Sequence, residues 1–340
     1  MAELLSVERL FADGYHNAFT DLRRWREHYY LCFRTAQTHG VDPPGDVVVY
    51  RSAELAHWEL CARLDTGADD RDPKLIDAGD RLAVNFGSWF PRWRGYSAPN
   101  SAPNEPWDLI SHIAVSRDGL AWSRPRQVYG VNYWLWRILP AEGGFYCPAY
   151  HFGVRGDRDM RTVHLLRSED LFDWRLVGLM RSGGGPGEPV LYQPEPGVLE
   201  CVVRTLEPRH HSWLGRSQAP YTEWTWQDLG VMIHAPVVLE VGGRRIVAGR
   251  SQEEDLPPGS FTPVREQVAQ AGHHTSVWEL VEGGLEHLLT VPSAGDCSYC
   301  GLAPDLAGDV AMSYYSQHER LPLADGPPTP ADVYLARFRL

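Results

Sequence analysis

The sequence predicts an all-β protein, and more narrowly a six-bladed β-propeller, from three observations. First, a short box that runs from a serine to a tryptophan recurs along the chain. The copies are Ser52 to Trp58, Ser116 to Trp122, Ser168 to Trp174 and, more loosely, Ser217 to Trp224. Second, their serines lie roughly 50 to 65 residues apart, a period typical of radial arrays of blades. Third, 32 Gly and 26 Pro supply turns between short apolar runs, and 13 Trp and 15 Tyr supply rings for blade cores.

Each repeat has the same internal order of three strands, the third of which enters the box. In the first unit these are Asn17 to Leu22, His28 to Arg34 and Val47 to Tyr50. Alternating and β-branched residues over such lengths favour strands over helices. The later units open with runs that begin at Asp70, Tyr133, Gly187, Ala235 and Asp296.

The two ends of the chain are expected to share one blade. The sixth unit ends with Val333 to Leu340 and lacks an outer strand, while Leu4 to Phe11 precedes the first unit. The early segment can supply the missing strand and close the ring, which hides sheet edges that would otherwise aggregate. We therefore expect residues 1–340 to form a single β-propeller domain.

Composition excludes several partners and cofactors. A formal net charge of −12 argues against nucleic acid or an anionic membrane, because both favour a basic surface. The sequence shows no signal peptide and no apolar run of membrane-spanning length, so a cytoplasmic location is expected. No cofactor motif is found, and Cys297 with Cys300 forms a C-x-x-C without the further ligands that a zinc site needs. We expect no cofactor and no metal.

The boxes and several other segments resemble the sialidase superfamily, whose Asp-box (BNR repeat) has the form Ser-x-Asp-x-Gly-x-x-Trp. Ser116 to Trp122 is a form of it that is one residue shorter. More narrowly, the chain is similar to bacterial proteins labelled sialidase-family or exo-α-sialidase-like. The segments that carry this likeness are His16 to Asp21, Asp69 to Lys74, Trp134 to Arg137, Val247 to Arg250, Gly295 to Tyr299 and Ser313 to Glu319.

The resemblance implies a catalytic tyrosine, a glutamate that takes its proton, an aspartate acid and three arginines that hold a substrate carboxylate. Tyr299 opens the first strand of the sixth unit, where the family places its nucleophile. Glu188 and Arg204, in the fourth unit, match the family's glutamate and one of its arginines. A neutral phenol needs a positioned base to act as a nucleophile, so Glu188 and Tyr299 are expected to work together.

The chain also departs from the family pattern. His16 and Asn17 stand where the first arginine belongs, and His274 stands near the place of the third and is a candidate substrate ligand. Arg71, Arg137 and Arg250 are candidates to bind an acidic sugar instead, because a guanidinium reads a carboxylate with two hydrogen bonds.

The general acid is left open among several residues. The loop after the second strand of the first unit offers His39 and Asp42, of which His39 exchanges a proton near neutral pH. Asp72 and Asp296 are alternatives, and Asp296 is also a candidate substrate ligand. The long polar insertion from Gly87 to Trp107 is expected to be a loop that shapes the site.

The leading hypothesis is a sialidase-like glycoside hydrolase that acts on a terminal sugar, acidic sugars included, as a small molecule or oligosaccharide. A polysaccharide lyase is one alternative, with Tyr299 or His39 as the base and an arginine on a uronate carboxylate. A glycan-binding propeller without catalysis is another. Its stacking platforms would be Trp89, Trp93, Trp107, Trp134 and Trp136.

Overall fold

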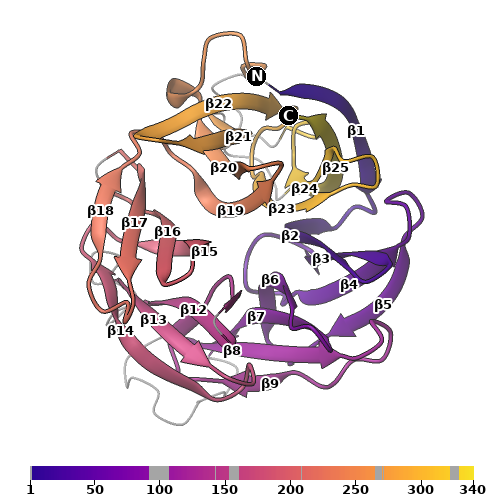
Figure 1. The fold of residues 1–340 in the computed structure, drawn as a ribbon. Helices are drawn as coiled ribbons and strands as arrows, with labels where there is room; N and C mark the ends of the chain where they lie inside the picture. Colours follow the sequence, from indigo (N-terminus) through magenta and orange to yellow (C-terminus); the bar gives the residue numbers. More distant parts are fainter. Residues whose placement is uncertain are drawn as a thin grey trace. The chain divides into compact units, whose positions relative to one another are not determined.

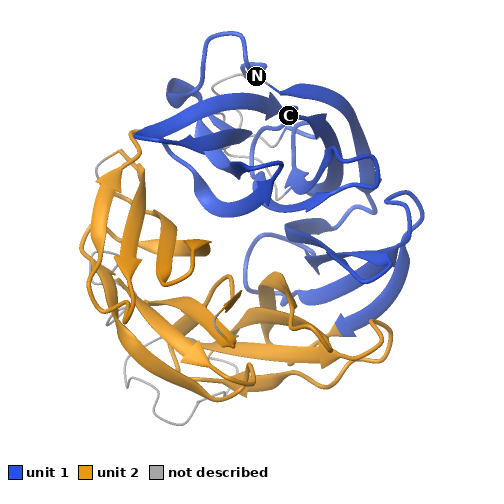
Figure 2. Ribbon diagram, in the orientation of Figure 1, with its two compact units in different colours: residues 1–63, 231–340 blue, residues 64–230 orange. Residues whose placement is uncertain are grey.

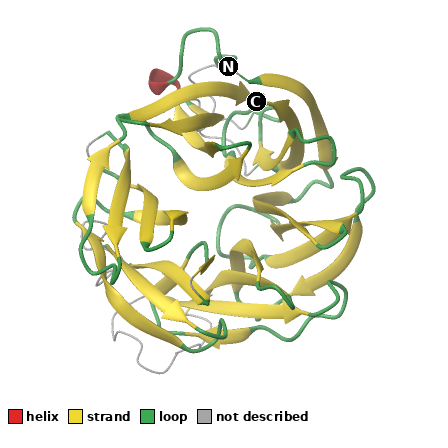
Figure 3. Ribbon diagram, in the orientation of Figure 1, coloured by secondary structure: helices red, strands yellow, loops and turns green. Residues whose placement is uncertain are grey.

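The fold is a six-bladed β-propeller made almost entirely of strands and turns (Figure 1, Figure 3). The computed structural model describes residues 2–91, 107–141, 143–152, 161–207, 209–264, 270, 272–321 and 329–340. Within these residues the chain divides into two compact units, residues 1–63 with 231–340 and residues 64–230 (Figure 2). Each unit contributes three antiparallel sheets. No helix in the described part is long and apolar enough to cross a membrane.

The first unit holds three four-stranded sheets. One consists of β2 (His16–Trp25), β3 (His28–Ala36), β4 (Asp46–Ser52) and β5 (Glu59–Leu64). Another consists of β19 (His234–Val241), β20 (Arg244–Gln252), β21 (His273–Val281) and β22 (Gly284–Val291). A short 3₁₀ turn, η4 (Glu253–Asp255), follows β20. The third sheet consists of β23 (Ser298–Pro304), β24 (Val310–Ser316), β25 (Asp332–Arg339) and β1 (Glu3–Phe11).

The second unit holds the other three sheets. The first consists of β6 (Asp69–Asp77), β7 (Leu82–Pro91), β8 (Trp107–Ser116) and β9 (Arg126–Val128). In the next, β10 (Tyr133–Leu135) and β11 (Leu139–Ala141) both pair with β12 (Gly144–His151), followed by β13 (Thr162–Ser168) and β14 (Trp174–Ser182). The last consists of β15 (Gly187–Glu195), β16 (Val198–Arg204), β17 (Ser212–Gln218) and β18 (Thr225–Asp228).

The predicted sharing of one blade by the two chain ends is confirmed. Strand β1 pairs antiparallel with β25 along its length, from Glu3 opposite Arg339 to Phe11 opposite Val333. The first strand of the chain is therefore the outermost strand of the last sheet, and Figure 1 shows both termini at that sheet.

The expected loop from Gly87 to Trp107 is shorter than the sequence suggested. Gly87 to Pro91 belongs to β7, and Trp107 is the first residue of β8. The strand continues because Gly87, Ser88 and Trp89 pair with β6 on one side and β8 on the other, which satisfies their backbone groups. Residues 92–106, including Trp93, lie outside the described part of the chain.

The serine-to-tryptophan boxes are held by their own side chains. In the second box, the Asp118 carboxylate accepts hydrogen bonds from the backbone N–H groups of Leu120 and Ala121, both at 2.8 Å. The Trp122 indole donates to the Gly119 carbonyl at 3.3 Å. The third box repeats this pattern around Asp170. These contacts use the box residues to shape a turn.

Several core clusters lie between neighbouring sheets of the same unit. One cluster in the first unit joins β19 to β22 with β23 to β25 and includes Ile246, Val277, Met312 and Phe338. In the second unit, Ile76, Ile113, Leu135 and Leu166 join the sheet of β6 to β9 with the sheet of β10 to β14. Cys32, Cys147 and Cys201 are fully buried and form no disulfide bond, as expected of small core residues.

Gly301 fixes how closely β23 approaches β2. A Cβ built on Gly301 would lie 1.8 Å from the Leu22 backbone nitrogen and 2.5 Å from the Asp21 carbonyl carbon. We expect Gly301→Ala to destabilise the protein by about 3 kcal/mol or more, because backbone on both sides would have to move. Gly284→Ala is the matched control, since its Cβ would meet no atom within 4 Å. Denaturant midpoints that fall equally for the two variants would contradict this packing.

Candidate functional site

The first strand of each sheet carries a β-bulge at the same place, and the bulge holds several of the predicted site residues. Between Ala18 and Asp21, β2 contains one residue more than the paired stretch of its neighbour β3. The strands β6, β15, β19 and β23 show the same shift against their partners. The bulged residues are Phe19, Asp72, Glu188, Ala235 and Tyr299, each with φ between 48° and 62°. Positive φ costs a non-glycine residue of order 1 to 3 kcal/mol, so it persists only where the surrounding structure enforces it.

Arg137 occupies the corresponding position in the remaining sheet. There the first strand is divided into β10 and β11, which both pair with β12. Between Leu135 and Leu139 this first strand contains one residue more than the paired stretch of β12. Trp136 donates its N–H to the Pro148 carbonyl, which places the extra residue directly after it. Four sequence-predicted site residues therefore share this structural position: Tyr299, Glu188, Asp72 and Arg137.

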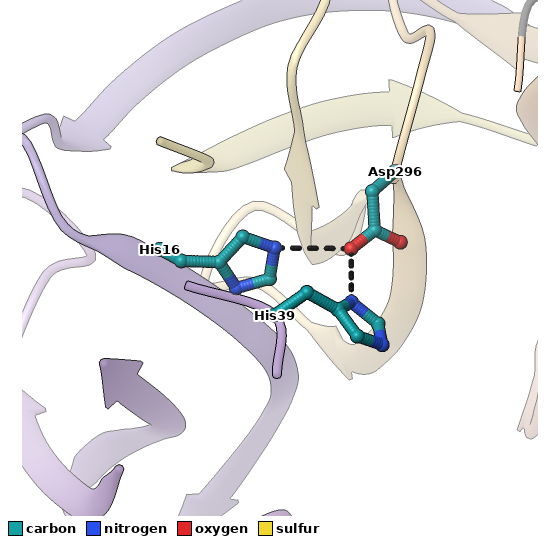
Figure 4. A group of neighbouring side chains, drawn as sticks. All are labelled: His16, His39 and Asp296. Atoms are coloured by element: carbon teal, nitrogen blue, oxygen red, sulfur yellow. Dashed lines mark hydrogen bonds and ion pairs between the residues drawn. The ribbon is translucent and has the colours of Figure 1, made fainter. Parts of the chain in front are cut away.

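In the first unit, the Asp296 carboxylate is the centre of a buried polar cluster (Figure 4). Its Oδ2 lies 2.6 Å from His39 Nδ1 and 3.0 Å from His16 Nε2. Its Oδ1 accepts hydrogen bonds from Arg250 Nη2 at 2.9 Å and from the Tyr315 hydroxyl at 2.7 Å. The four partners come from different segments of the unit, so the cluster exists only in the folded chain.

Charge and hydrogen bonding keep Asp296 ionised. Burial alone would raise the pKa of Asp296, but His39, His16 and Arg250 outweigh burial and hold it well below its usual range. Burial lowers the pKa of His16, which keeps that ring neutral despite its bond to Asp296. Asp296 is therefore suited to orient His39 and is a poor proton donor, although the sequence left it open as the acid.

His39 combines a fixed ring with access to solvent. Its side chain is 54% exposed, whereas the side chain of Asp296 is 6% exposed. An Nδ1–H group that donates to Asp296 selects the tautomer in which Nε2 exchanges protons. Of the two residues that the sequence offered in this loop, His39 is thus the one equipped as a general acid or base.

Tyr299 lies beside this cluster and is held by its backbone. The Tyr299 carbonyl accepts a hydrogen bond from Thr20 Oγ1 at 2.8 Å, which links the bulges of β2 and β23. The Tyr299 ring centroid is 4.9 Å from that of Phe19 and 5.5 Å from the Arg250 guanidinium carbon. Phe19 also contacts His39, with ring centroids 5.5 Å apart. The structure therefore brings Tyr299, His39, Asp296 and Arg250 into one group.

Arg250 is used mainly inside the protein. Besides Asp296 it donates to the Cys297 carbonyl, from Nε at 3.0 Å and from Nη2 at 2.6 Å. Burial alone would lower the pKa of Arg250, but Tyr315 and Asp296 raise it well above its usual range. The guanidinium therefore stays charged and fixes Asp296 together with the turn that leads to Tyr299.

His274 contacts residues other than those of the Asp296 cluster. Its Nδ1 lies 3.0 Å from the Ser293 carbonyl, and its ring centroid is 4.7 Å from that of Phe261. It lines a cavity of about 770 Å³ together with Pro263, Val291 and His318. The Ser293 contact joins it to the loop that precedes Asp296.

In the second unit, Glu188 pairs with Arg204 and lies near Tyr150. Arg204 Nη1 is 2.8 Å from Glu188 Oε1, so the glutamate and arginine predicted from the sequence are in contact. Burial first, and then the charges of Glu188 and Asp72, raise the pKa of Tyr150 well above its usual range. Tyr150 is therefore a buried phenol whose ionisation is opposed by the charges of both Glu188 and Asp72. Three consecutive glycines with positive φ, Gly183 to Gly185, precede this strand.

The other candidates of the second unit have structural partners. Arg71 Nε donates to Asp69 Oδ2 at 2.5 Å. Trp134 and Trp136 are 2% and 1% exposed, so they pack inside and do not serve as stacking platforms for a sugar. Trp134 stacks on Tyr150, with ring centroids 5.9 Å apart. The aromatic residues predicted to bind glycan at these two positions are core residues.

Asp70 makes the stability of this unit pH-dependent. It is fully buried, and burial raises its pKa to about 7 even though Ser88 and Thr66 donate hydrogen bonds to it. Because the folded state resists ionisation of this acid, stability falls as pH rises from about 4 to about 7, by roughly 4 kcal/mol in total. Asp70→Asn should remove this loss. Urea titrations at pH 4.5 and pH 8 measure the free energy of unfolding of both proteins. Relative to the parent, the variant should be more stable at pH 8 than at pH 4.5, and an equal difference in stability at the two pH values would contradict the prediction.

Sequence reasoning missed His16, Tyr315, Phe19 and Thr20 as members of the first-unit cluster. His16 stood in the sequence where a family arginine was expected, which was a usable signal. Phe19, Thr20 and Tyr315 lie in segments that resemble the family, but nothing in the sequence singled them out within those segments, because their roles depend on contacts with residues roughly 20 to 300 positions away.

Comparisons with known proteins support the fold and leave the family open. No family model matches the chain, and no curated protein matches it. Among solved structures, it resembles a protein of unknown function from Dyadobacter fermentans, with a TM-score of 0.76 and 16% identity over 98% of this chain and 99% of that one. It also resembles Trypanosoma rangeli sialidase in complex with sialic acid, with a TM-score of 0.66 and 11% identity over 98% of this chain.

The chain spans 58% of the length of that sialidase. A Bombyx mori GH32 β-fructofuranosidase gives a TM-score of 0.53 and 12% identity over 100% of this chain and 92% of that one. At such identities the likeness concerns the fold alone. The chain shares the β-propeller fold of sialidases and GH32 enzymes.

Proposed function

We propose that this protein is a glycoside hydrolase that acts on a terminal sugar, acidic sugars included, with Tyr299 as nucleophile; Glu188 stays the base that the sequence predicts. The observation that carries the proposal is the group in the first unit, in which Tyr299 lies beside Arg250 and shares the Phe19 ring with His39. The group holds a phenol that can act as a nucleophile, an imidazole that can exchange protons and a fixed positive charge.

Arg250 supports Tyr299 as a nucleophile. Its guanidinium carbon lies 5.5 Å from the centre of the Tyr299 ring, and its charge is maintained by Asp296 and Tyr315. A fixed positive charge at this distance stabilises the negative charge that develops as the phenol loses its proton.

His39 supplies the acid and base steps in this proposal. In the first step the Tyr299 hydroxyl loses its proton to the base, for which the sequence predicts Glu188, and its oxygen bonds to the anomeric carbon. The bond from that carbon to the leaving oxygen breaks, and His39 Nε2 gives a proton to the leaving oxygen. In the second step His39 takes a proton from water, the water oxygen displaces Tyr299, and the base returns the proton to the Tyr299 oxygen. Asp296 holds the ring throughout through the 2.6 Å contact with Nδ1.

The test is a panel of aryl glycosides of neutral and acidic terminal sugars. We expect release of the aryl alcohol together with a reducing sugar from at least one member of the panel. His39→Gln should lower turnover most for substrates with poor leaving groups, since those depend on the acid. Equal loss for good and poor leaving groups would remove His39 from the acid role.

A second candidate is a polysaccharide lyase, which the His39, Tyr299 and Arg250 group favours. A histidine or tyrosine base beside a guanidinium can remove the proton next to a uronate carboxylate, and elimination then expels the 4-linked sugar. The product would be an unsaturated uronate that absorbs in the near ultraviolet. Appearance of that absorbance with oligouronate substrates would decide for the lyase, and a saturated reducing product would decide for the hydrolase.

A further inference from the structure

The Asp296 cluster also has the composition of a metal site. His16, His39 and Asp296 offer two nitrogens and one oxygen that all lie within 4.8 Å of one another (Figure 4). Two histidines and one carboxylate are a ligand set used by zinc and by other first-row divalent metals.

The orientation of the carboxylate fits this use. Arg250 and Tyr315 both bind Asp296 Oδ1, whereas both histidine nitrogens approach Oδ2. Groups that hold the outer oxygen of a metal-binding carboxylate are a regular part of metal sites, because they fix the inner oxygen toward the metal. Here the inner oxygen faces both imidazoles.

Accessibility and charge indicate an exchangeable site. His16 is 1% exposed and gives a rigid ligand, while the 54% exposure of the His39 side chain gives a metal a route from solvent. Arg250 balances the charge of Asp296, so a metal here would bind less tightly than in a structural zinc site. Two imidazole ligands favour Zn²⁺ or Ni²⁺ over Mg²⁺ or Ca²⁺, which prefer oxygen.

We propose that His16 Nε2, His39 Nδ1 and Asp296 Oδ2 bind a divalent first-row transition metal. The metal takes the electron pair of His39 Nδ1, which in the metal-free protein bears the proton donated to Asp296. Metal binding and the fixed tautomer of His39 therefore exclude one another. This exclusion predicts that bound metal inhibits turnover. The prediction of inhibition rests on the proposed function, whereas the proposed metal binding does not.

Isothermal titration of the whole protein with Zn²⁺, Ni²⁺ and Mg²⁺ tests the binding. We expect one site for Zn²⁺ and Ni²⁺, with affinity at least about tenfold above that for Mg²⁺, and a loss of at least about tenfold in His39→Gln and in His16→Asn. The exposed His57, whose Nδ1 contacts Glu54, supplies the control His57→Gln, which should bind as the parent does. His39 is exposed, so its variant should fold even where His16→Asn does not.

Absence of Zn²⁺ binding, or equal binding in His39→Gln and the parent, would overturn the proposal. Thermal unfolding gives a second readout, since Zn²⁺ should raise the Tm of the parent and of His57→Gln and leave that of His39→Gln unchanged. The binding measurements use no substrate, so failure of the glycosidase proposal leaves them interpretable. If turnover is found and saturating Zn²⁺ does not lower it, the assignment of His39 as acid is wrong while the metal site stands.

Discussion

Tyr299→Phe is expected to lower turnover by at least about a thousandfold while substrate binding stays within a few fold. The variant removes one oxygen and keeps the ring that contacts Phe19 and Arg250. The Thr20 bond to the Tyr299 carbonyl does not involve the side chain, so the strand should keep its position. Single-turnover kinetics on the best substrate of the glycoside panel would measure the effect.

Tyr314→Phe is the matched control for this experiment. Tyr314 is a buried tyrosine of the adjacent strand β24, and its hydroxyl donates to the Pro292 carbonyl at 2.9 Å. Loss of that bond should cost about 1 kcal/mol of stability and leave turnover nearly unchanged. If both variants lose turnover equally, the effect of Tyr299→Phe is structural and the nucleophile assignment fails.

The pairing of Tyr299 with Glu188 stays a prediction, and a double variant tests it. If Glu188 acts only by activating Tyr299, Glu188→Gln should add little to the loss already caused by Tyr299→Phe. If the fold-losses in turnover of the two single variants multiply in the double variant, the two residues act independently. Glu188 would then be a structural partner of Arg204, which it contacts at 2.8 Å.

The sequence predicted the blades well because their determinants are local. Strand periodicity, turn residues and the box contacts around Asp118 and Asp170 lie within a few positions of one another. Counting from the boxes also placed Tyr299 and Glu188 at the opening of their first strands, where the structure has a bulge. The same local reasoning gave too long a loop after Phe86, because polar and proline residues signal turns while pairing with two neighbouring strands extends β7.

The candidate site was less accessible from the sequence because it depends on distant partners. Asp296 looked like an alternative acid, yet its role follows from four donors that only the fold brings together. Arg250 looked like a reader of substrate carboxylate, and the structure shows two of its three nitrogens engaged inside the protein. Burial likewise turned Trp134 and Trp136 from surface candidates into packing residues.

Asp296→Ala should be among the most destabilising single changes at this site. It would leave the buried, charged Arg250 without its carboxylate and remove the acceptor of Tyr315, at a cost of about 3 to 5 kcal/mol. The exposed pair of Arg63 and Asp46, 2.7 Å apart, supplies the comparison, since Asp46→Ala should cost about 1 kcal/mol or less. Denaturant unfolding of the two variants measures both effects.

A second substitution separates loss of the ion pair from loss of packing. If the cost of Asp296→Ala comes from the charge left on Arg250, then adding Arg250→Met should recover part of the stability, because no unpaired charge remains in the interior. If packing dominates, the double variant should be less stable than Asp296→Ala alone. Recovery would mean that the same carboxylate that orients His39 also neutralises Arg250, so that the residue holding the proposed acid is required for the folded state itself.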